Sequence, residues 1–561
     1  MRPAPKIADD KLLLQQFYKT VARRGAAPYL TQPMGGGRIE EFSYERALDE
    51  ARRMASHLKS LGYEPGSQIA MISKNCAWFL ITELAIWMAG YTSVALYPTL
   101  NAETVQYILE HSEAKLLFVG KLDTWAEMKP GVPDGLPMIR FPLSPDEDCP
   151  KWNDIIAESA PIDGPPTRAG SDLAIIVYTS GSTGRPKGVC HSFAGLSLAA
   201  HGLHEALNLR PDDRALSYLP LAHVMERWAY GCVPLVVGFH LFFAESLDTF
   251  VQDLQRARPT LFISVPRLWL KFQLGVFKKM PEKKLKRMLK IPILRGIVKK
   301  KILQNLGLDQ VRFAASGSAP VPAELIQWYR DLGLQLLEGY GMSENMSYSH
   351  VSTPGRAKAG FVGHTYADVE CRISDEGEIQ VKSPANMMGY FKAPELTEAA
   401  FTEDGWLKTG DRGEVAPDGL LKITGRVKEL FKTAKGKYVA PAPIENILNN
   451  DGHIELSCVA GSGQVKPHAV VQLSEDLLPT LDQPGVKDKI TKALEALIGT
   501  VNSQVEVFEQ IGFIVVAKDR WTIEAGFLTP TMKIRRPKLE DTYGPQQDGW
   551  YAENKKVIWE A

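Results

Sequence analysis

Residues 178–188 read Tyr178-Thr-Ser-Gly-Ser-Thr-Gly-Arg-Pro-Lys-Gly188, and they follow a continuous apolar run from Leu173 to Tyr178. The run is long enough for one buried strand. After this run come four hydroxyl residues, two glycines and one lysine, namely Thr179, Ser180, Gly181, Ser182, Thr183, Gly184 and Lys187. Small residues let backbone N–H groups turn toward one anion, while the hydroxyl groups and the lysine add donors and positive charge. The stretch therefore predicts a phosphate-binding loop after a strand, with a helix beginning near Phe193.

Two alternatives for this loop are less favourable. A Walker A motif needs a hydroxyl residue next to its lysine, but Pro186 precedes Lys187 and Gly188 follows it. A flexible Ser/Gly linker is the other alternative. A linker would need neither the apolar strand before it nor the Pro-Lys-Gly after it, so phosphate binding is favoured.

Length and composition indicate an ordinary globular protein with more than one domain. The chain has 561 residues, and its 65 basic and 65 acidic side chains balance, so nothing points to a nucleic-acid partner. The six cysteines lack CxxC spacing, which argues against a zinc site or a disulfide framework and fits a reducing compartment. Residues 1–24 contain no apolar core of a secretory signal. We therefore expect a cytoplasmic protein, and the oligomeric state stays open.

The most hydrophobic segment is Phe79 to Pro98, with Glu83 as its one charged residue. It resembles a membrane span in length. Because Gly90 and two hydroxyl residues interrupt it, a buried helix leading into a buried strand is favoured. Helical and strand patterns alternate from Phe42 to Val119. That alternation predicts an α/β fold in which largely parallel sheets are covered by helices on both faces.

Two later loops also place small residues after a strand. The first follows a strand near residues 311–315 and the second a strand near 334–337. They contain Gly317, Ser318 and Ala319, and then Glu338, Gly339, Tyr340, Gly341, Met342, Ser343 and Glu344. In such loops a purine and a ribose can approach the backbone, Tyr340 offers a face for stacking, and Glu344 offers an oxygen ligand for Mg²⁺.

His223 follows a predicted strand at residues 215–220, at the strand end where open α/β sheets place ligands. Taken alone, it is better explained as a capping or core histidine. The apolar stretch from Tyr230 to Leu247 is consistent with the lining of a hydrophobic channel and equally with ordinary core.

Taken together, these motifs resemble those of the adenylate-forming superfamily, which comprises acyl-CoA synthetases, adenylation domains and luciferases. The resemblance runs from about Phe42 to Arg536. It includes, in order, the loop at 178–188, the Pro-x-x-His segment, the two loops above, Thr409-Gly-Asp411, Gly425-Arg426 and the lysine before Ile534-Arg-Arg536. Leu430 to Pro441, followed by Ile444-Glu-Asn446, closely resembles the long-chain fatty acid–CoA ligase subgroup. Met532 stands where the wider superfamily often has glycine, a departure that long-chain members share.

The resemblance implies a role for each matched residue. The implied catalytic residues are Lys533, Lys187 and Glu344, and the implied Mg²⁺ ligands are Glu344 and Thr179. The implied nucleotide contacts are the residues of the three loops together with Asp411, Arg426 and Lys533, although Asp411 and Arg426 would also suit an ion pair at a turn edge. The implied acyl-pocket residues are His223 and Trp228, the hinge is Lys428, and Gly436 borders the CoA tunnel.

The resemblance also implies two domains, a large N-terminal domain at residues 1–427 and a small mobile α/β domain at 428–561. With ATP, Mg²⁺ and CoA, the expected reaction converts a long-chain fatty acid to acyl-AMP and then to acyl-CoA. Two alternatives are an acyl-AMP ligase that passes the acyl group to a carrier protein, and an inactive lipid-binding homologue. Retention of the charged site residues disfavours the inactive homologue. CoA dependence of product formation separates the two enzymes.

Lys278 to Lys301 contains eleven lysine or arginine residues and one acid, Glu282. Apolar residues recur there at helical spacing, namely Leu285, Met288 and Leu289, and then Leu294, Ile297 and Val298 beyond Pro292. Such a basic amphipathic pattern is typical of helices that lie on an anionic membrane surface. A solvated helix packed by its apolar stripe explains it equally well. Peripheral membrane contact and ordinary packing therefore both remain open.

Overall fold

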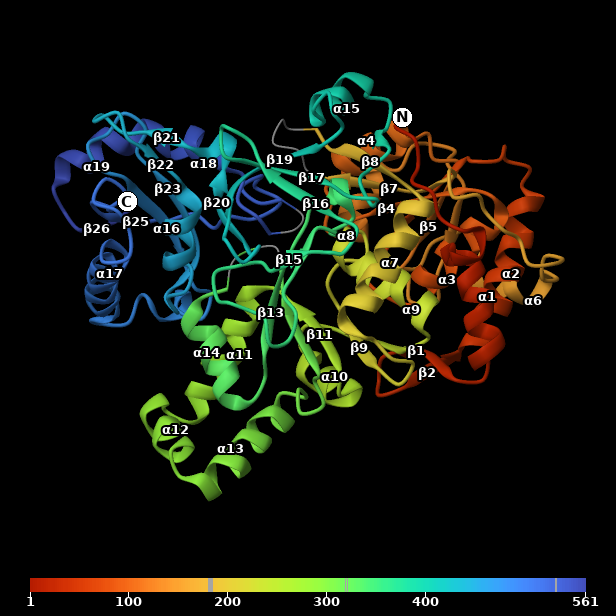
Figure 1. Ribbon diagram of the computed structural model, residues 1–561, viewed down its shortest axis with the longest axis horizontal. Coiled ribbons are helices and arrows are strands. Elements are labelled where there is room, and N and C mark those ends of the chain that lie inside the picture. Colours follow the sequence, from red (N-terminus) through yellow and green to blue (C-terminus); the bar gives the residue numbers. More distant parts are fainter. Residues whose placement is uncertain (180–184, 318, 320, 530–531, 561) are drawn as a thin grey trace.

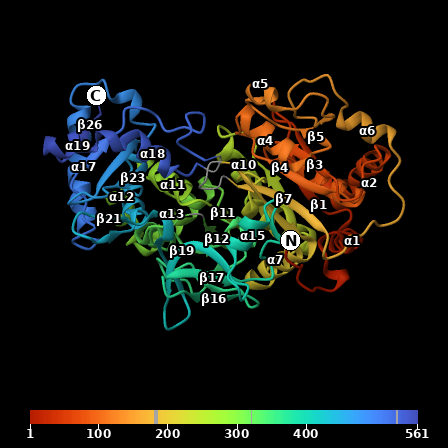
Figure 2. The ribbon, with the colours of Figure 1, turned by 90° about the horizontal axis from the view of Figure 1, so that it is seen from above.

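The computed structural model describes residues 1–179, 185–317, 319, 321–529 and 532–560. The predicted nucleotide-binding residues Ser180, Gly181, Ser182, Thr183, Gly184 and Ser318 therefore lie outside the described residues. In the described part of the chain the strands form five sheets. The C-terminal elements, coloured blue in Figure 1, form a lobe at one end of the molecule, and Figure 2 shows the same arrangement from above.

One sheet carries the strand that precedes the predicted phosphate loop. Its strands, in spatial order, are β18 (Gly389–Tyr390), β8 (Lys187–Ser192), β7 (Leu173–Thr179), β4 (Thr92–Leu96), β3 (Gln68–Ile72), β5 (Leu116–Val119) and β6 (Met138–Arg140). From β7 to β6 neighbouring strands are parallel, while β8 and β18 add antiparallel strands at one edge. The helices α3 (Ala77–Ala89) and α4 (Ala102–Ser112) alternate with the parallel strands, as the sequence pattern predicts.

The largest sheet carries the two small-residue loops. Its spatial order is β15 (His364–Thr365), β14 (His350–Val351), β13 (Leu336–Tyr340), β12 (Phe313–Ser316), β11 (Leu261–Ser264), β9 (Arg214–Ser217), β10 (His240–Phe243), β1 (Pro28–Pro33) and β2 (Ile39–Ser43). From β13 to β1 neighbouring strands are parallel. The loops after β9, β12 and β13 therefore leave the same edge of the sheet, where α/β folds bind ligands.

The remaining strands form smaller sheets. β16 (Glu370–Ile373), β17 (Glu378–Lys382), β19 (Leu407–Val415) and β20 (Leu421–Arg426) are antiparallel. In the C-terminal lobe, β21 (Phe431–Lys432) pairs with β22 (Tyr438–Val439), and β23 (Ile454–Ala460), β24 (His468–Leu473), β25 (Ile514–Val516) and β26 (Val557–Trp559) form a mixed sheet. This lobe has apolar clusters of its own, built around residues such as Ile444 and Val515.

Helices cover the sheets of the larger part and of the lobe (Figure 1). The other α-helices are α1 (Leu13–Arg24), α2 (Tyr44–Ser60), α5 (Trp125–Met128), α6 (Trp152–Glu158), α7 (Phe193–Leu207), α8 (Val224–Glu226), α9 (Val233–Val237), α10 (Phe250–Ala257), α11 (Pro266–Lys279), α12 (Glu282–Leu289), α13 (Pro292–Asn305), α14 (Ala323–Leu332), α15 (Pro394–Ala400), α16 (Pro441–Leu448), α17 (Val486–Asn502), α18 (Arg536–Tyr543) and α19 (Gln547–Glu553). Short turns of other helical types are η1 (Asp9–Lys11), η2 (Lys129–Gly131), η3 (Arg227–Cys232), η4 (Ser343–Asn345), η5 (Val427–Glu429), η6 (Leu478–Thr480) and η7 (Gly544–Gln546). The predicted α/β class, with parallel-rich sheets under helices and a smaller C-terminal α/β unit, is confirmed.

Side-chain caps explain where several of these helices begin. Ser43 accepts a hydrogen bond from the Arg46 N–H at the start of α2, and Asn101 accepts one from the Thr104 N–H at the start of α4. Such caps satisfy backbone donors that the first turn leaves unpaired. Ser192 caps α7 in the same way, so the helix begins at Phe193, as predicted.

The apolar segment at residues 79–98 lies in the core, as predicted. Every residue of α3 is buried, and β4 follows it. The carboxylate of Glu83 accepts a 2.8 Å hydrogen bond from the Ser93 hydroxyl and lies 3.4 Å from the guanidinium of Arg227, which is itself fully buried. A buried charge needs partners of this kind. Within the described ranges, no helix has both the length and the apolar character needed to cross a bilayer.

Candidate active site

The strands beside the predicted phosphate loop hold its two ends together. β7 and β8 are antiparallel, and Thr179 lies opposite Lys187 in their register. Gly188 permits close packing behind them, because a Cβ there would come within 2.9 Å of the Ile176 side chain and 3.2 Å of Phe391 Cβ. Thr179 and Lys187 therefore stand side by side where phosphate binding is predicted.

Glu344 is held by a tyrosine from another part of the chain. Its Oε1 accepts a hydrogen bond of 2.7 Å from the hydroxyl of Tyr390. The ammonium of Lys187 lies 5.2 Å from the centre of the Tyr390 ring, a cation–π contact. Tyr390 is in place because β18 pairs with β8, which sets it opposite Val189. Tyr390 thus connects the predicted phosphate-binding lysine with the predicted metal ligand.

His191 fixes the turn that carries Glu344. Its Nε2 donates to the backbone carbonyl of Ser343 over 2.8 Å, and the Met387 N–H donates to the carbonyl oxygen of Glu344 over 2.7 Å. Burial lowers the pKa of His191 to about 4, so the ring is neutral at neutral pH. The sequence motifs identify neither His191 nor Tyr390, because both reach the Glu344 turn through contacts between segments far apart in the sequence.

The surroundings of Glu344 fit the predicted Mg²⁺ site. Tyr390 orients one carboxylate oxygen, and no described residue donates to the other, Oε2. Mg²⁺ is commonly held by one or two carboxylates together with substrate phosphates rather than by an all-protein cage. The described residues contain no group of three or more His, Cys, Asp and Glu side chains arranged to hold a metal ion by themselves. The Mg²⁺ site at Glu344 stays a prediction.

Asp411 joins two other predicted nucleotide-binding residues, Tyr340 and Arg426. Its Oδ2 accepts a 2.7 Å hydrogen bond from the Tyr340 hydroxyl, and its Oδ1 accepts a 2.9 Å hydrogen bond from Nε of Arg426. The register of β19 and β20 sets Asp411 directly opposite Arg426. The structure therefore contains the ion pair between Asp411 and Arg426 that the sequence offered as an alternative to nucleotide binding. The pair lies beside Tyr340. A role of Asp411 and Arg426 toward ribose stays a prediction.

Glu338 ties the loop after β12 to β13. Its Oε1 accepts a hydrogen bond of 3.2 Å from the Val321 N–H, and burial raises its pKa to about 7. Gly317 and Gly339 face each other across these strands, since a Cβ on Gly317 would lie 3.8 Å from the Gly339 carbonyl oxygen. Ala319 is exposed beyond them. The described residues of the two loops therefore lie side by side, and a purine site between them stays a prediction.

His223 lies beyond β9, which ends at Ser217 rather than at residue 220 as predicted, and it is the N-cap residue of α8. Its Nδ1 accepts a 3.2 Å hydrogen bond from the Met225 N–H, so it caps that helix. Burial, and secondarily the positive charge of Lys533, lower its pKa to about 4. The buried Glu226, which sequence reasoning missed, anchors the segment by accepting hydrogen bonds from the Ser217 hydroxyl at 2.7 Å and the Tyr218 N–H at 3.0 Å. Burial raises the pKa of Glu226 to about 8.

Trp228 is part of the core. It is 6% exposed, and its indole N–H donates to the Ala199 carbonyl over 2.8 Å. Its ring meets Tyr348 and Tyr366 edge-on. These contacts describe a packed structural side chain, so its predicted place at the acyl pocket stays a prediction.

Lys533 reaches the same region from the C-terminal lobe. Its N–H donates to Oγ1 of Thr529 over 3.1 Å, and its carbonyl accepts from the Thr529 N–H over 2.8 Å. The residue is exposed to solvent, but desolvation by the surrounding atoms and then the charge of Arg426 lower the pKa of its ammonium. Its charge also acts on Asp411 and His223. Residues from both parts of the chain therefore meet at one place.

The predicted hinge and CoA-tunnel residues lie on the lobe side. Lys428 is in η5, directly after β20, and β20 runs beside α16, the first α-helix of the lobe (Figure 1). Gly436 lies in the turn between β21 and β22 with φ +76°, a conformation that favours glycine. The turn alone explains this glycine, so its role toward CoA stays a prediction.

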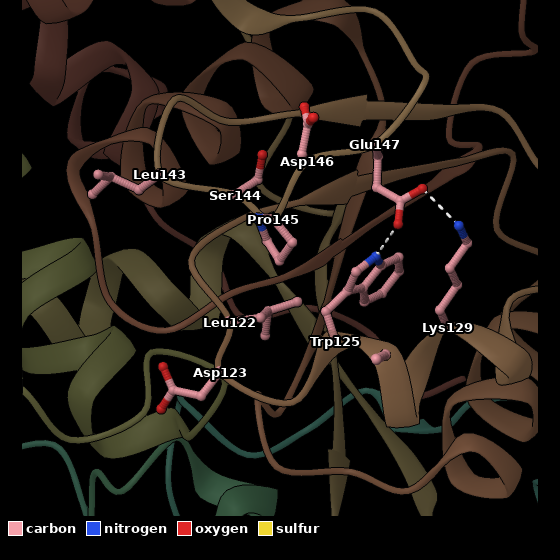
Figure 3. A pocket seen from close by; sticks show the side chains of 10 residues that line it. Leu122, Asp123, Trp125, Lys129, Leu143, Ser144, Pro145, Asp146 and Glu147 are labelled. Atoms are coloured by element: carbon pink, nitrogen blue, oxygen red, sulfur yellow. Dashed lines mark hydrogen bonds and ion pairs between the residues drawn. The ribbon is translucent and has the colours of Figure 1, made fainter.

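A surface hollow beside α5 is separate from these residues (Figure 3). Its lining consists of Leu122, Asp123, Trp125, Ala126, Lys129, Leu143, Ser144, Pro145, Asp146 and Glu147. The Glu147 carboxylate accepts hydrogen bonds from the Trp125 indole at 2.6 Å and from the Lys129 ammonium at 2.7 Å. Because Glu147 is already paired and the hollow shares no residue with the site above, it gives no support for a second active site.

Replacing Tyr390 by phenylalanine is expected to weaken the use of Mg²⁺ and ATP. The change keeps the ring beside Lys187 but removes the hydroxyl that orients Glu344. A hydrogen bond to a charged group contributes about 1.5–3 kcal/mol, so kcat/KM for the nucleotide should fall roughly ten- to a hundredfold. The measurement is pyrophosphate release over a range of Mg²⁺ concentrations, and the Mg²⁺ requirement should rise. Tyr63→Phe removes an exposed hydroxyl that donates to the Lys115 carbonyl, and it serves as the control. An unchanged Mg²⁺ requirement in Tyr390→Phe would contradict the assigned contact.

Two family models match this chain. The model for AMP-binding enzymes covers residues 17–391, and the model for the AMP-binding enzyme C-terminal domain covers residues 429–555. Among curated proteins, the long-chain-fatty-acid–CoA ligase FadD15 of Mycobacterium bovis is 30% identical over 556 residues, which span 90% of this chain and 91% of that protein. The human long-chain-fatty-acid–CoA ligase 1 is 29% identical over 614 residues, spanning 97% of this chain and 87% of that one.

Solved structures agree on the fold. The adenylation domain of a carboxylate reductase from Mycobacterium chelonae matches with a TM-score of 0.80 and 22% identity, covering 96% of this chain and 91% of that domain. The corresponding domain from Segniliparus rugosus, in complex with AMP and a co-purified carboxylic acid, matches with a TM-score of 0.78 and 23% identity, covering 97% and 94%. The AMP-binding enzyme model alone matches more than half of the 561 residues of this chain, so the chain belongs to the AMP-binding enzyme family.

Proposed function

We propose that this protein is a long-chain fatty acid–CoA ligase, which uses ATP to convert a fatty acid to acyl-AMP and then passes the acyl group to CoA. The observation that carries the proposal is the meeting of Lys533, Asp411 and Arg426 at one place in a chain whose relatives, matched over nine-tenths of its length, are named long-chain-fatty-acid–CoA ligases. Those names describe the relatives. The chain-length preference of this protein is part of the proposal.

The first half-reaction is limited by repulsion between negative charges. A carboxylate oxygen attacks the α-phosphorus of ATP, the bond to the bridging oxygen breaks, and pyrophosphate leaves. Positive groups aimed at the developing charge lower the barrier. Lys533 would neutralise charge between the carboxylate and the α-phosphate, and Lys187 would act on the leaving phosphates. Mg²⁺, held by Glu344 and Thr179 together with the phosphates, would add positive charge at the phosphate oxygens.

The neutral state of His223 suits a place beside the carboxylate. Burial and Lys533 hold its pKa near 4, so the ring contributes no positive charge at neutral pH that would trap the substrate carboxylate as an ion pair. Its Nδ1 is engaged with the Met225 N–H, which fixes the direction of the ring. We propose that His223 orients the substrate carboxylate while Lys533 supplies the charge.

The second half-reaction transfers the acyl group to sulfur. The CoA thiolate attacks the acyl carbonyl, and AMP leaves with the electron pair of the acyl–oxygen bond. We propose that residues 428–561 rotate about Lys428 relative to residues 1–427, so that Lys533 leaves the site and the Gly436 turn enters. A glycine turn would allow the thin pantetheine arm to pass close to the backbone. One site would then serve both half-reactions by hinge motion.

A series of straight-chain acids assayed with ATP, with and without CoA, tests the proposal. The apolar segment after His223 includes Tyr230, Val233 and Leu241, which are fully buried as ordinary core side chains are, so a long apolar acyl pocket there is part of the proposal. Burying one CH₂ contributes about 0.8 kcal/mol, so catalytic efficiency should rise roughly fourfold per CH₂ until the pocket ends. The measured products are pyrophosphate and acyl-CoA.

Each other outcome of this series has a definite meaning. A maximum at acetate or butyrate would refute the long-chain substrate. Acyl-AMP that forms normally but never passes to CoA would favour a carrier protein as the acceptor. An absence of pyrophosphate release with every acid would favour the inactive lipid-binding homologue.

A further inference from the structure

The helices α12 and α13 form a hairpin that projects from the body of the protein beyond α11 and α14 (Figure 1). The base of the hairpin is anchored, because Leu285, Val298 and Ile302 are buried in the apolar cluster that also contains Trp269 and Phe272. Residues 290–297, by contrast, are all exposed. We call residues 290–297 the basic tip.

The basic tip exposes an unusual amount of apolar side chain. Ile293 is 81% exposed, Ile297 60%, Ile291 45% and Leu294 36%. Positions 293, 294 and 297 lie on one face of α13, since residues one turn apart are neighbours on a helix. The sequence pattern groups Leu294 and Ile297 with Val298 in one apolar stripe, with packing and membrane contact both open. The structure divides them, because Val298 faces the core and the other two face solvent.

Positive charge surrounds the exposed apolar face. Of the eleven lysine and arginine residues from Lys278 to Lys301, only two form ion pairs with described residues, Lys278 with Asp476 and Lys286 with Glu282. Glu282 is the one acid in this stretch. Lys300 and Lys301 follow Ile293 and Leu294 by seven positions and therefore share their face of α13. The hairpin thus combines apolar side chains with uncompensated cations.

We propose that the basic tip docks on an anionic phospholipid surface, with Ile293 and Ile297 entering the boundary between head groups and acyl chains. Helices that lie on membranes have this combination of an apolar face and flanking cations. Charge complementarity selects the lipid over a second copy of this chain, because self-association would bring two strongly positive hairpins together. A nucleic acid would satisfy the cations but would leave the four exposed apolar side chains in water. The docking does not depend on the proposed acyl substrate.

Sedimentation of the full-length protein with vesicles tests the proposal. Vesicles of phosphatidylcholine with phosphatidylglycerol should bind the protein at low salt, and vesicles of phosphatidylcholine alone should not. Binding should be lost at about 1 M salt, where the screening length falls to about 3 Å. Failure of the parent protein to bind the anionic vesicles at low salt would overturn the proposal.

Two sets of variants separate the apolar from the charged contribution. Ile293→Ser with Ile297→Ser should lower binding at least tenfold, whereas Leu247→Ser with Val507→Ser, at sites 93% and 76% exposed elsewhere, should leave it unchanged. Lys283→Gln, Lys284→Gln, Arg287→Gln and Lys290→Gln together should abolish binding, since each cation near the surface strengthens it about fivefold. The matched set Lys59→Gln, Lys115→Gln, Lys151→Gln and Lys492→Gln changes exposed lysines elsewhere and should retain most of it.

Two further measurements test whether misfolding or self-association causes a loss of vesicle binding. All variants should keep the parent melting temperature and, without vesicles, the parent activity on a soluble medium-chain acid, because the changed side chains lie outside the core and the site. If the variant with Ile293→Ser and Ile297→Ser and the variant with the four glutamines on the hairpin both bind vesicles as well as the parent, membrane contact lies elsewhere and the proposal is overturned. If sedimentation velocity without vesicles shows that the parent is a dimer and that the hairpin variants are monomers, the basic tip is a contact between copies of the chain, which also overturns the proposal.

Discussion

Lys533→Ala is expected to lower the rate of acyl-AMP formation by about 10²–10³-fold, which corresponds to about 2.7–4 kcal/mol of lost stabilisation of developing charge. Lys533 lies on the C-terminal lobe, and its charge interacts with the charges of Arg426 and Asp411 and acts on His223. Transfer of the acyl group from preformed acyl-AMP to CoA should continue at nearly the parent rate, because Lys533 would have left the site in that step. The measurement is the rate of each half-reaction, assayed separately on the same variant.

A control in the same loop makes this test specific. Met532 has φ +61° and is 59% exposed, so its backbone adopts the left-handed conformation that favours glycine. Met532→Gly should keep both half-reactions, since it relieves the backbone and touches no charge. Equal loss of both half-reactions in Lys533→Ala would argue against two arrangements of the lobe. Equal loss in Met532→Gly would show that the loop conformation, rather than the ammonium, controls the rate.

The pH dependence of the first half-reaction should also depend on the charge of Lys533. Desolvation and Arg426 lower the pKa of Lys533, so its positive charge is lost at a lower pH than that of an ordinary lysine. Adenylate formation should therefore decline on the alkaline side earlier than the second half-reaction, in which Lys533 takes no part. Lys533→Arg would keep the charge at every accessible pH and should remove this early decline if it restores activity.

Local sequence signals predicted much of the fold, because helix starts and buried apolar runs depend on residues that are close together in the sequence. The helix near Phe193 follows directly after the loop motif, and α3 is recognisable from an apolar run alone. In the structure Ser43, Asn101 and Ser192 each accept a hydrogen bond from the N–H three residues later, so these helix starts depend on local contacts. Strand ends were less accurate. The strand predicted at 311–315 is β12, Phe313–Ser316, because an apolar run does not say where its neighbours β11 and β13 begin to pair.

The residues that sequence reasoning missed at the site depend on contacts between distant segments. Tyr390 belongs to a strand of two residues with no periodic pattern, and it reaches Glu344 only because β18 adds to the edge of β8. His191 lies on the buried strand β8, where a core histidine is the ordinary expectation, and its contact with the Ser343 carbonyl joins β8 to the turn η4 that follows β13. A single sequence contains the motifs but not the pairings that bring them together.

Lys428→Pro is expected to allow adenylate formation and to block acyl transfer, so that acyl-AMP accumulates while the yield of acyl-CoA falls at least tenfold. Proline fixes φ near −65°, which lies within the range of the single helical turn η5 in which Lys428 is found. The variant should therefore tolerate the arrangement in which Lys533 lies in the site. A large change of φ at this residue, which a hinge requires, would be prevented. Separate assays of the two half-reactions, with a melting temperature to verify folding, provide the measurement.

Arg267→Ala distinguishes a blocked hinge from a weakened contact between the lobe and the rest of the protein. Arg267, in α11, donates to the Ile454 carbonyl at 2.7 Å and to Ser474 Oγ at 3.2 Å, and it pairs with the carboxylate of Glu455. These contacts must break if the lobe rotates, so removing them should slow adenylate formation modestly and leave acyl transfer at the parent rate or faster. Lys428→Pro should have the opposite pattern. Normal acyl-CoA output from Lys428→Pro would place the hinge elsewhere, and a loss of acyl transfer in Arg267→Ala would mean that these contacts support the second half-reaction rather than the first.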